Sequence, residues 1–154
     1  MTGTIIPMDR QGLLRREEGS WAAFASAFAA VAPDRLDHEG VVPGWSTKDL
    51  VWHCAYWARF CAEALEATSA DAAWTDPFAG QTDEDWDGEN ARIAEESKAM
   101  SWDGILSETG RVRQRVRAAL SAAPDRDELA EWFAEETFTH YDEHAEEIRR
   151  FIGT

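Results

Sequence analysis

Residues 46–65 read STKDLVWHCAYWARFCAEAL, and this stretch decides the fold. Ser46 is followed three residues later by Asp49, which is close to a capping box, an arrangement that satisfies backbone N–H groups of a first helical turn. The residues after it recur at alternating spacings of three and four, the period of one face of an α-helix. The face that this predicts to be buried comprises Leu50, His53, Trp57, Phe60 and Ala64.

The same period predicts helices on both sides of this one. The first runs from Asp9 to Val31, and the last from Asp127 to Phe151. Between the second and the last helix, residues 69–87 have no clean period and predict a long loop, followed by a third helix in two pieces, 87–98 and 102–122. No strand pattern is present, so the sequence predicts an all-α fold, an antiparallel four-helix bundle with a long loop between helices 2 and 3 and a broken third helix.

The composition limits the partners that the protein can have. The 154 residues predict a single domain, 1–154, and a net charge of −15 repels phosphate backbones, so we expect no nucleic-acid partner. The basic run RVRQRVR at 111–117 is interpreted as arginines on a solvated helix flank that face neighbouring acids, with Val112 and Val116 at the core edge. No signal segment or membrane span is apparent, which predicts a soluble, cytoplasmic protein. Cys54 and Cys61 are seven apart on one helix, too far for a disulfide, and are expected to be free buried thiols.

Three of the four histidines lie on predicted buried faces. At about 100° per residue, with Phe133 at zero, His140 lies near about −20° and His144 near about +20°, so both face the core. Buried imidazoles need partners, and side chains four apart on a helix can converge on one divalent metal ion. His53 could supply a third ligand, whereas His38 belongs to a loop. The alternative is three core histidines, each hydrogen-bonded to a carboxylate or a carbonyl group.

Three neutral imidazoles leave a coordination position open, which is typical of a reactive metal site. Glu136 and Glu147 flank the histidine face and could orient the imidazole rings, although both could equally be exposed helix acids. Trp57, one turn after His53, could line an apolar pocket beside the metal. The catalytic residue itself is not assigned; a metal-bound water or thiol is expected. Such a site would act on a small molecule, and the acidic surface favours a neutral or cationic electrophile.

Three segments resemble one known family. The run GWSTKDLVWHCAYW at 44–57 resembles the second-helix motif of the DinB-like (YfiT) superfamily, in which a Trp and a Ser or Thr precede a K-D-L-x-x-H helix. TFTHYDEHAEEIRRF at 137–151 resembles that family's fourth helix, and WDGENARIAEESKAMSWDGIL at 86–106 resembles its broken third helix. The superfamily includes the N-terminal domain of the mycothiol-dependent maleylpyruvate isomerases, which commonly carry Glu at the position of His140.

The resemblance implies a four-helix bundle, often a homodimer, that binds Ni²⁺, Zn²⁺ or a similar ion. The implied ligands are His53, His140 and His144. Relatives include thiol-dependent transferases and isomerases that use a low-molecular-weight thiol, and small hydrolases. We therefore expect a metal-dependent transferase or hydrolase. The alternative from another class is a non-catalytic protein that sequesters a small molecule or a metal.

Overall fold

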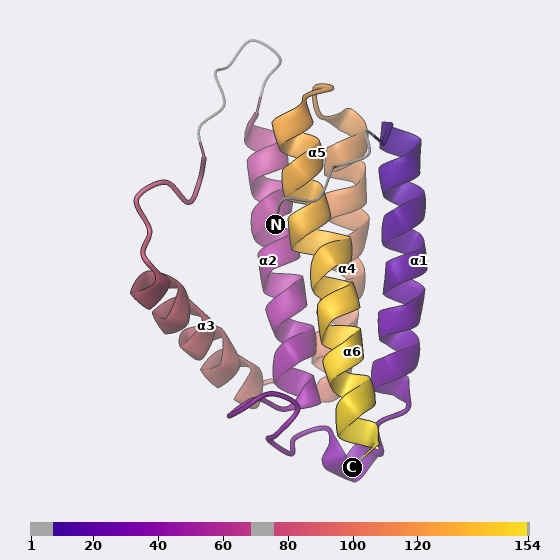
Figure 1. The fold of residues 1–154 in the computed structure, drawn as a ribbon, viewed down its shortest axis with the longest axis vertical. Helices are drawn as coiled ribbons and strands as arrows, with labels where there is room; N and C mark the ends of the chain where they lie inside the picture. Colours follow the sequence, from indigo (N-terminus) through magenta and orange to yellow (C-terminus); the bar gives the residue numbers. More distant parts are fainter. Residues whose placement is uncertain (1–7, 69–75, 154) are drawn as a thin grey trace.

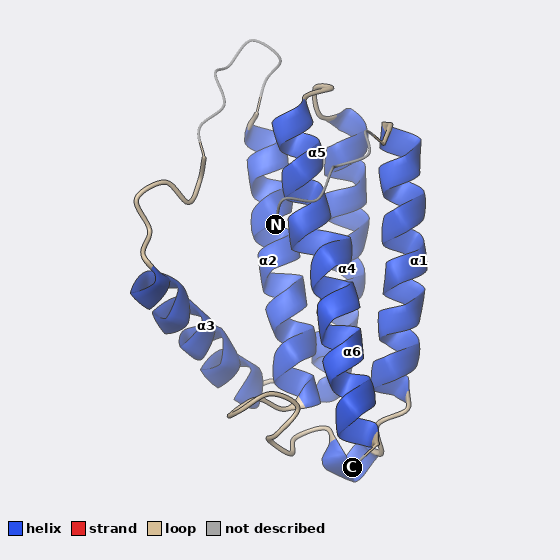
Figure 2. Ribbon diagram, in the orientation of Figure 1, coloured by secondary structure: helices blue, strands red, loops and turns tan. Residues whose placement is uncertain are grey.

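The computed structural model describes residues 8–68 and 76–153, and within them every regular element is a helix (Figure 2). This confirms the predicted all-helical class. No helix in the described part is both long enough and apolar enough to span a membrane. The elements are α1 (Arg10–Ala29), the 3₁₀ turn η1 (Pro33–Arg35), α2 (Thr47–Ala67), α3 (Asp83–Lys98), α4 (Trp102–Ala122), α5 (Asp127–Ala134), the π-helical turn η2 (Glu135–Thr139) and α6 (His140–Ile152).

Short polar side chains start the long helices. Asp9 accepts a hydrogen bond from the backbone of the first turn of α1, and Ser101 does the same for α4. The predicted capping box of α2 is present: the Ser46 hydroxyl accepts from the Asp49 N–H at 3.1 Å, and the Asp49 carboxylate accepts from the Ser46 N–H at 2.9 Å. These bonds replace the partners that the first N–H groups of a helix lack, and so they fix where each helix begins.

The loop predicted at residues 69–87 ends earlier than expected. α3 begins at Asp83, because Thr82 and Asp85 form a second capping box. The Thr-x-x-Asp spacing that predicts this start lies among acidic residues, in a stretch that has no apolar period. Residues 69–75 of the predicted loop lie outside the described residues.

The helices form a bundle in which α1, α2, α4 and the α5–α6 segment lie side by side, while α3 leans away at the edge (Figure 1). α3 packs chiefly against α2. Arg115, in the second half of α4, donates to Glu66 near the end of α2 at 2.6 Å, and Figure 1 shows that these two helices run in the same direction. The prediction treated 87–98 and 102–122 as two pieces of one helix. In the structure α3 runs back along the outside of the bundle, so α4 begins at the same end as α2 and runs parallel to it.

The segment predicted as one helix, 127–151, is interrupted by η2, in which the backbone is wound as a π-helix. The Thr137 hydroxyl donates to the carbonyl oxygen of Phe133 at 2.7 Å within this turn, a bond that competes with regular helix geometry. A π turn adds one residue to the helix, so the buried positions that follow are shifted relative to a continuous α-helix. Tyr141 and Ile148 accordingly lie in the core, with 2% and 0% of their surface exposed.

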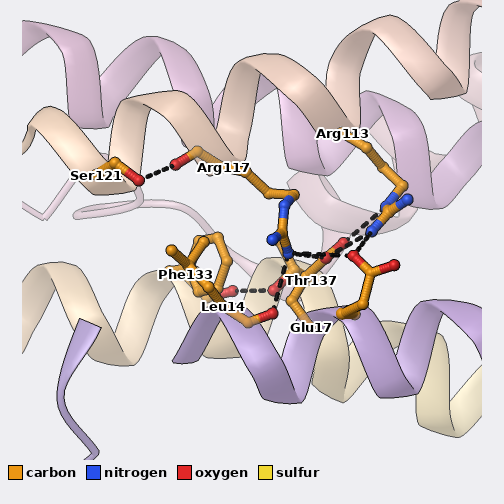
Figure 3. A network of polar contacts seen from close by, with 8 residues as sticks. Leu14, Glu17, Arg113, Arg117, Ser121, Phe133 and Thr137 are labelled. Atoms are coloured by element: carbon orange, nitrogen blue, oxygen red, sulfur yellow. Dashed lines mark hydrogen bonds and ion pairs between the residues drawn. The ribbon is translucent and has the colours of Figure 1, made fainter. Parts of the chain in front are cut away.

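The basic run at 111–117 contributes to both the core and an internal ion pair. Val112 and Val116 are buried, as predicted. Arg113 and Arg117, expected on a solvated flank, instead reach the carboxylate of Glu17 on α1, which is fully buried (Figure 3). Sequence periodicity places an arginine on the correct side of a helix, but it cannot show that an acid is buried opposite it.

Candidate metal centre

His53 lies in the first half of α2, on the face that meets α6. Its residue surface is 8% exposed, and the indole ring of Trp45 packs edge-on against it with ring centres 5.3 Å apart. Trp45 directly precedes the Ser46 cap, so the cap that starts α2 also positions the ring that covers His53. The apolar cover excludes water from one side of the imidazole.

The two histidines of α6 face His53 across the helix pair. The ring centre of His53 lies 5.2 Å from that of His140 and 5.2 Å from that of His144. The two α6 rings are 5.7 Å apart. The structure therefore brings together the three histidines that the sequence singled out, and His38 lies exposed in the loop before α2.

The π turn decides how α6 presents these rings. His140 is the first residue after η2, and it is only partly buried, while the core position next to it is taken by Tyr141. The sequence predicted that both histidines face the core. His144 is buried, as predicted, whereas His140 is only partly buried, because the extra residue of η2 turns α6 relative to a continuous helix.

Burial keeps two of the three imidazoles, those of His53 and His140, uncharged. Burial lowers the pKa of His53 to about 2, with further lowering from His140 and His144, and burial followed by His144 lowers the pKa of His140 to about 4. The Nδ1 atoms of His53 and His140 are buried, and neither has a hydrogen-bond partner among the described residues. A buried ring nitrogen without a partner costs about 1 to 3 kcal/mol, so these atoms are held in place by the surrounding packing.

The sequence indicated two glutamates beside the histidines, and the structure shows one of them, Glu147, in contact with a ring. Glu147, one turn after His144, contacts its Nδ1 atom through Oε1. Because a carboxylate only accepts, the Nδ1 atom of His144 carries a proton in this contact. Glu136 lies in η2, with its Oε2 atom buried and unpartnered, and burial together with Glu135 raises the pKa of its carboxyl group to about 8.

The donor set suits a divalent cation, although the side chains are not arranged as a finished site. Within residues 8–68 and 76–153, no group of three or more His, Cys, Asp or Glu side chains already has the geometry to hold a metal ion. The ring separations are nevertheless those of imidazoles around one ion, because metal–nitrogen bonds of about 2.1 Å in a tetrahedral site put ring centres about 5 Å apart. Rings at these separations, two of them with a buried nitrogen that has no partner within the described residues, fit such an ion.

Trp57 belongs to a different cluster of side chains. Its ring packs against Trp86 at 5.2 Å, and its Nε1 donates to Asn90 on α3 at 3.0 Å. It thus lines a cavity between α2 and α3, one helical turn along α2 from His53. Cys54 and Cys61 are free and buried, as predicted, and burial raises the pKa of both thiols, so neither is a ready nucleophile.

Two residues have roles that the sequence did not reveal. Trp45 covers His53, and its place directly before a helix cap is a signal that could have indicated this. No sequence signal indicates that Glu17 is buried, because a glutamate between Arg16 and Glu18 resembles any exposed helix acid.

Most of the sequence matches the model of one known protein family. Residues 17–141 match the model of the mycothiol maleylpyruvate isomerase N-terminal domain. The chain belongs to this family. The resemblance found in the three sequence segments is thereby confirmed, and the match runs from α1 into the first turn of α6, including two of the three histidines.

A solved structure supports the same fold. The chain is similar to an uncharacterised protein from Escherichia coli UTI89, with a TM-score of 0.76 at 13% identity over 94% of this chain and 93% of that one. At this identity the likeness concerns the fold alone. No match was found among the curated proteins.

Proposed function

We propose that this member of the mycothiol maleylpyruvate isomerase N-terminal domain family is a metal-dependent enzyme acting on a small electrophilic molecule. The observation that carries the proposal is the meeting of three imidazoles from α2 and α6, with ring centres 5.2 to 5.7 Å apart. His53, His140 and His144 would hold the ion, Ni²⁺ or Zn²⁺. Core histidines with separate partners would not need to share one place, and two of these rings have a buried nitrogen with no partner.

The bound ion would supply Lewis acidity, which lowers the pKa of a low-molecular-weight thiol or of water. The side chains supply the rest. Glu147 fixes the ring orientation of His144 through its Nδ1 atom. Glu136, whose carboxyl group holds a proton up to a pKa of about 8, can exchange that proton with a reactant near neutral pH. Trp45 keeps water from one side of His53.

A thiol would make the protein a transferase and water would make it a hydrolase. The alternative of sequestration without catalysis would give tight ligand binding with no turnover when thiols and several metals are supplied. A homodimer, suggested by the family, stays a prediction; among the described residues Met8 is the only exposed large hydrophobic side chain. Size-exclusion chromatography with light scattering tests it.

The first experiment is elemental analysis of untagged protein purified without metal columns, because imidazole sites acquire nickel or copper during purification. Wild type is compared with His140→Ala and with His38→Ala, the exposed loop histidine, as a matched control. We expect near-stoichiometric metal in wild type and in the control, and its loss in His140→Ala. Equal metal in all three proteins, or none after nickel or zinc is added, would overturn the proposal.

A further inference from the structure

A cavity of about 390 Å³ lies between α2, α3 and the segment that leads into α3. Its volume falls within the range of about 300 to 1,000 Å³ that is typical of small-molecule sites. Three of its walls are aromatic side chains of α2, a fourth is an aromatic ring of the connecting segment, and two carboxylates come from α3. These residues are Tyr56, Trp57, Phe60, Phe78, Asp85 and Glu89.

The aromatic wall is built around Phe78. Its ring stacks on Phe60 with centres 5.4 Å apart, and it meets Trp86 edge-on at 4.5 Å and Trp132 at 5.6 Å. Trp57 closes the group at 6.0 Å from Phe78. Aromatic faces carry partial negative charge, so a cluster of this kind attracts cations as well as apolar rings.

The charges around the cavity also favour a cation. Glu89 is ionised, because a hydrogen bond from Arg92 and a second from Tyr56 lower the pKa of its carboxyl group. The Arg92 guanidinium is committed to that pair and lies over the Tyr56 ring at 5.4 Å. Arg59 lies over the same ring at 5.2 Å, so this aromatic group already attracts two cations from the protein itself.

Asp85 is the second carboxylate that lines the cavity. One of its oxygens, Oδ2, accepts a hydrogen bond from the N–H of Thr82 at 2.9 Å, and within the described residues no arginine or lysine forms an ion pair with it. Two further acids, Asp83 and Glu84, share the first turn of α3. Because the whole chain carries a net charge of −15, its field disfavours the approach of an anion.

We propose that this cavity binds a small organic cation that carries an aromatic ring, with the ring against Trp57 and Phe78 and the ammonium group against Asp85. Binding of this kind needs no metal. Trp57 lies one turn along α2 from His53, so, resting on the proposed function, the bound molecule would be the substrate of the metal centre. The inference therefore gives the chemical class that the proposed enzyme would accept.

The test uses full-length protein treated with a chelator, so that its outcome is separate from the metal analysis. Three probes share one ring and differ in charge: phenethylammonium, 2-phenylethanol and phenylacetate. Titrations are followed by tryptophan fluorescence and by calorimetry. We expect the ammonium to bind about 3- to 30-fold more tightly than the alcohol, which is the range of a cation held by aromatic faces, and the acetate to bind more weakly than both.

Variants locate the site. Asp85→Asn keeps an oxygen for the Thr82 N–H and removes the charge, so we expect it to weaken binding of the ammonium about threefold or more and to leave the alcohol unchanged. Phe78→Leu keeps apolar volume and should weaken both probes. Glu95→Gln makes the same charge change at an exposed position of the same helix and should change neither. Circular dichroism and urea midpoints check that each variant is folded.

Three results would overturn the proposal. These are equal binding of all three probes, weakening of the ammonium in Glu95→Gln as large as in Asp85→Asn, and no saturable binding of the ammonium below about 10 mM, the range expected of a fragment-sized ligand. Metal content is measured in the same preparations before chelation, as a separate test of the metal centre. Loss of probe binding with metal present refutes the cavity alone, and probe binding without a metal site refutes only the substrate assignment.

Discussion

Replacement of Glu17 by glutamine tests how much the internal ion pair matters. Glu17 is fully buried and accepts hydrogen bonds from Arg113 at 2.8 and 2.7 Å and from Arg117 at 2.7 Å (Figure 3). Glu17→Gln removes the charge and leaves both guanidinium groups facing a neutral amide. Their remaining acidic neighbour, Glu18, is 64% exposed and more distant, at 3.3 and 3.6 Å.

The magnitude follows from the burial of the three charges. Breaking a buried ion pair by removing one partner costs about 3 to 5 kcal/mol. The side chains of Arg113 and Arg117 keep 17% and 31% of their surface exposed, so water relieves part of the penalty. We therefore expect Glu17→Gln to lower the free energy of unfolding by about 3 kcal/mol, which is a shift of about 1 to 2 M in the urea midpoint.

The assay is urea unfolding followed by circular dichroism, with Glu18→Gln as the matched control. Glu18 is the next residue, makes the same kind of contact with the same arginines, and is exposed, so its loss should cost less than about 1 kcal/mol. A difference of less than about 1 kcal/mol between the two variants would refute the reasoning. The ion pair would then be screened by water despite its buried carboxylate.

Three further predictions concern the histidine region. In metal-free protein the pKa of the Glu136 carboxyl group is about 8, against 4.5 for the free side chain, so the folded state keeps a proton that the unfolded state loses. Between about pH 5 and pH 8, wild type should therefore lose on the order of 3 to 4 kcal/mol of stability relative to Glu136→Gln. The same dependence of the urea midpoint on pH in both proteins would contradict this. Glu147→Gln should weaken metal binding about 10- to 100-fold in competition with a chelator, whereas Glu146→Gln, at an exposed position, should not. Ser46→Ala should cost about 0.5 to 2 kcal/mol in urea unfolding through the lost helix cap, and a smaller effect would show that Asp49 alone fixes the start of α2.

The sequence predicted the helices well where caps and apolar period agreed. Ser46 and Asp49 placed the start of α2, and the pair of Cys54 and Cys61 was correctly expected to be free. It failed where only one signal was present. The start of α3 at Asp83 had a cap without an apolar stripe, and the interruption at η2 had a stripe that a continuous helix also explains.

The candidate site was predictable in its members but not in its geometry. His53, His140 and His144 stood out by residue type and spacing, and the structure places their rings together. Their orientation depends on the π turn, which periodicity cannot detect because it assumes a constant rotation per residue. The role of Trp57 shows the same limit: the residue was expected near a pocket, but its neighbours on α3 could not be known from a segment that had no clean period.

The π turn also makes the winding of the last helix a constraint of its own. Deleting one residue between 135 and 139 would produce a more regular helix, with every backbone hydrogen bond closer to its usual geometry. The residues after it would keep their orientation, because the turn holds one residue more than a continuous α-helix needs, so His140 and His144 would still face His53. Substitutions that make the segment regular without shortening it would instead turn everything after it by about 100° and move both histidines away from His53. A single-residue deletion in this short segment should therefore be tolerated better than substitutions that remove the π turn at constant length.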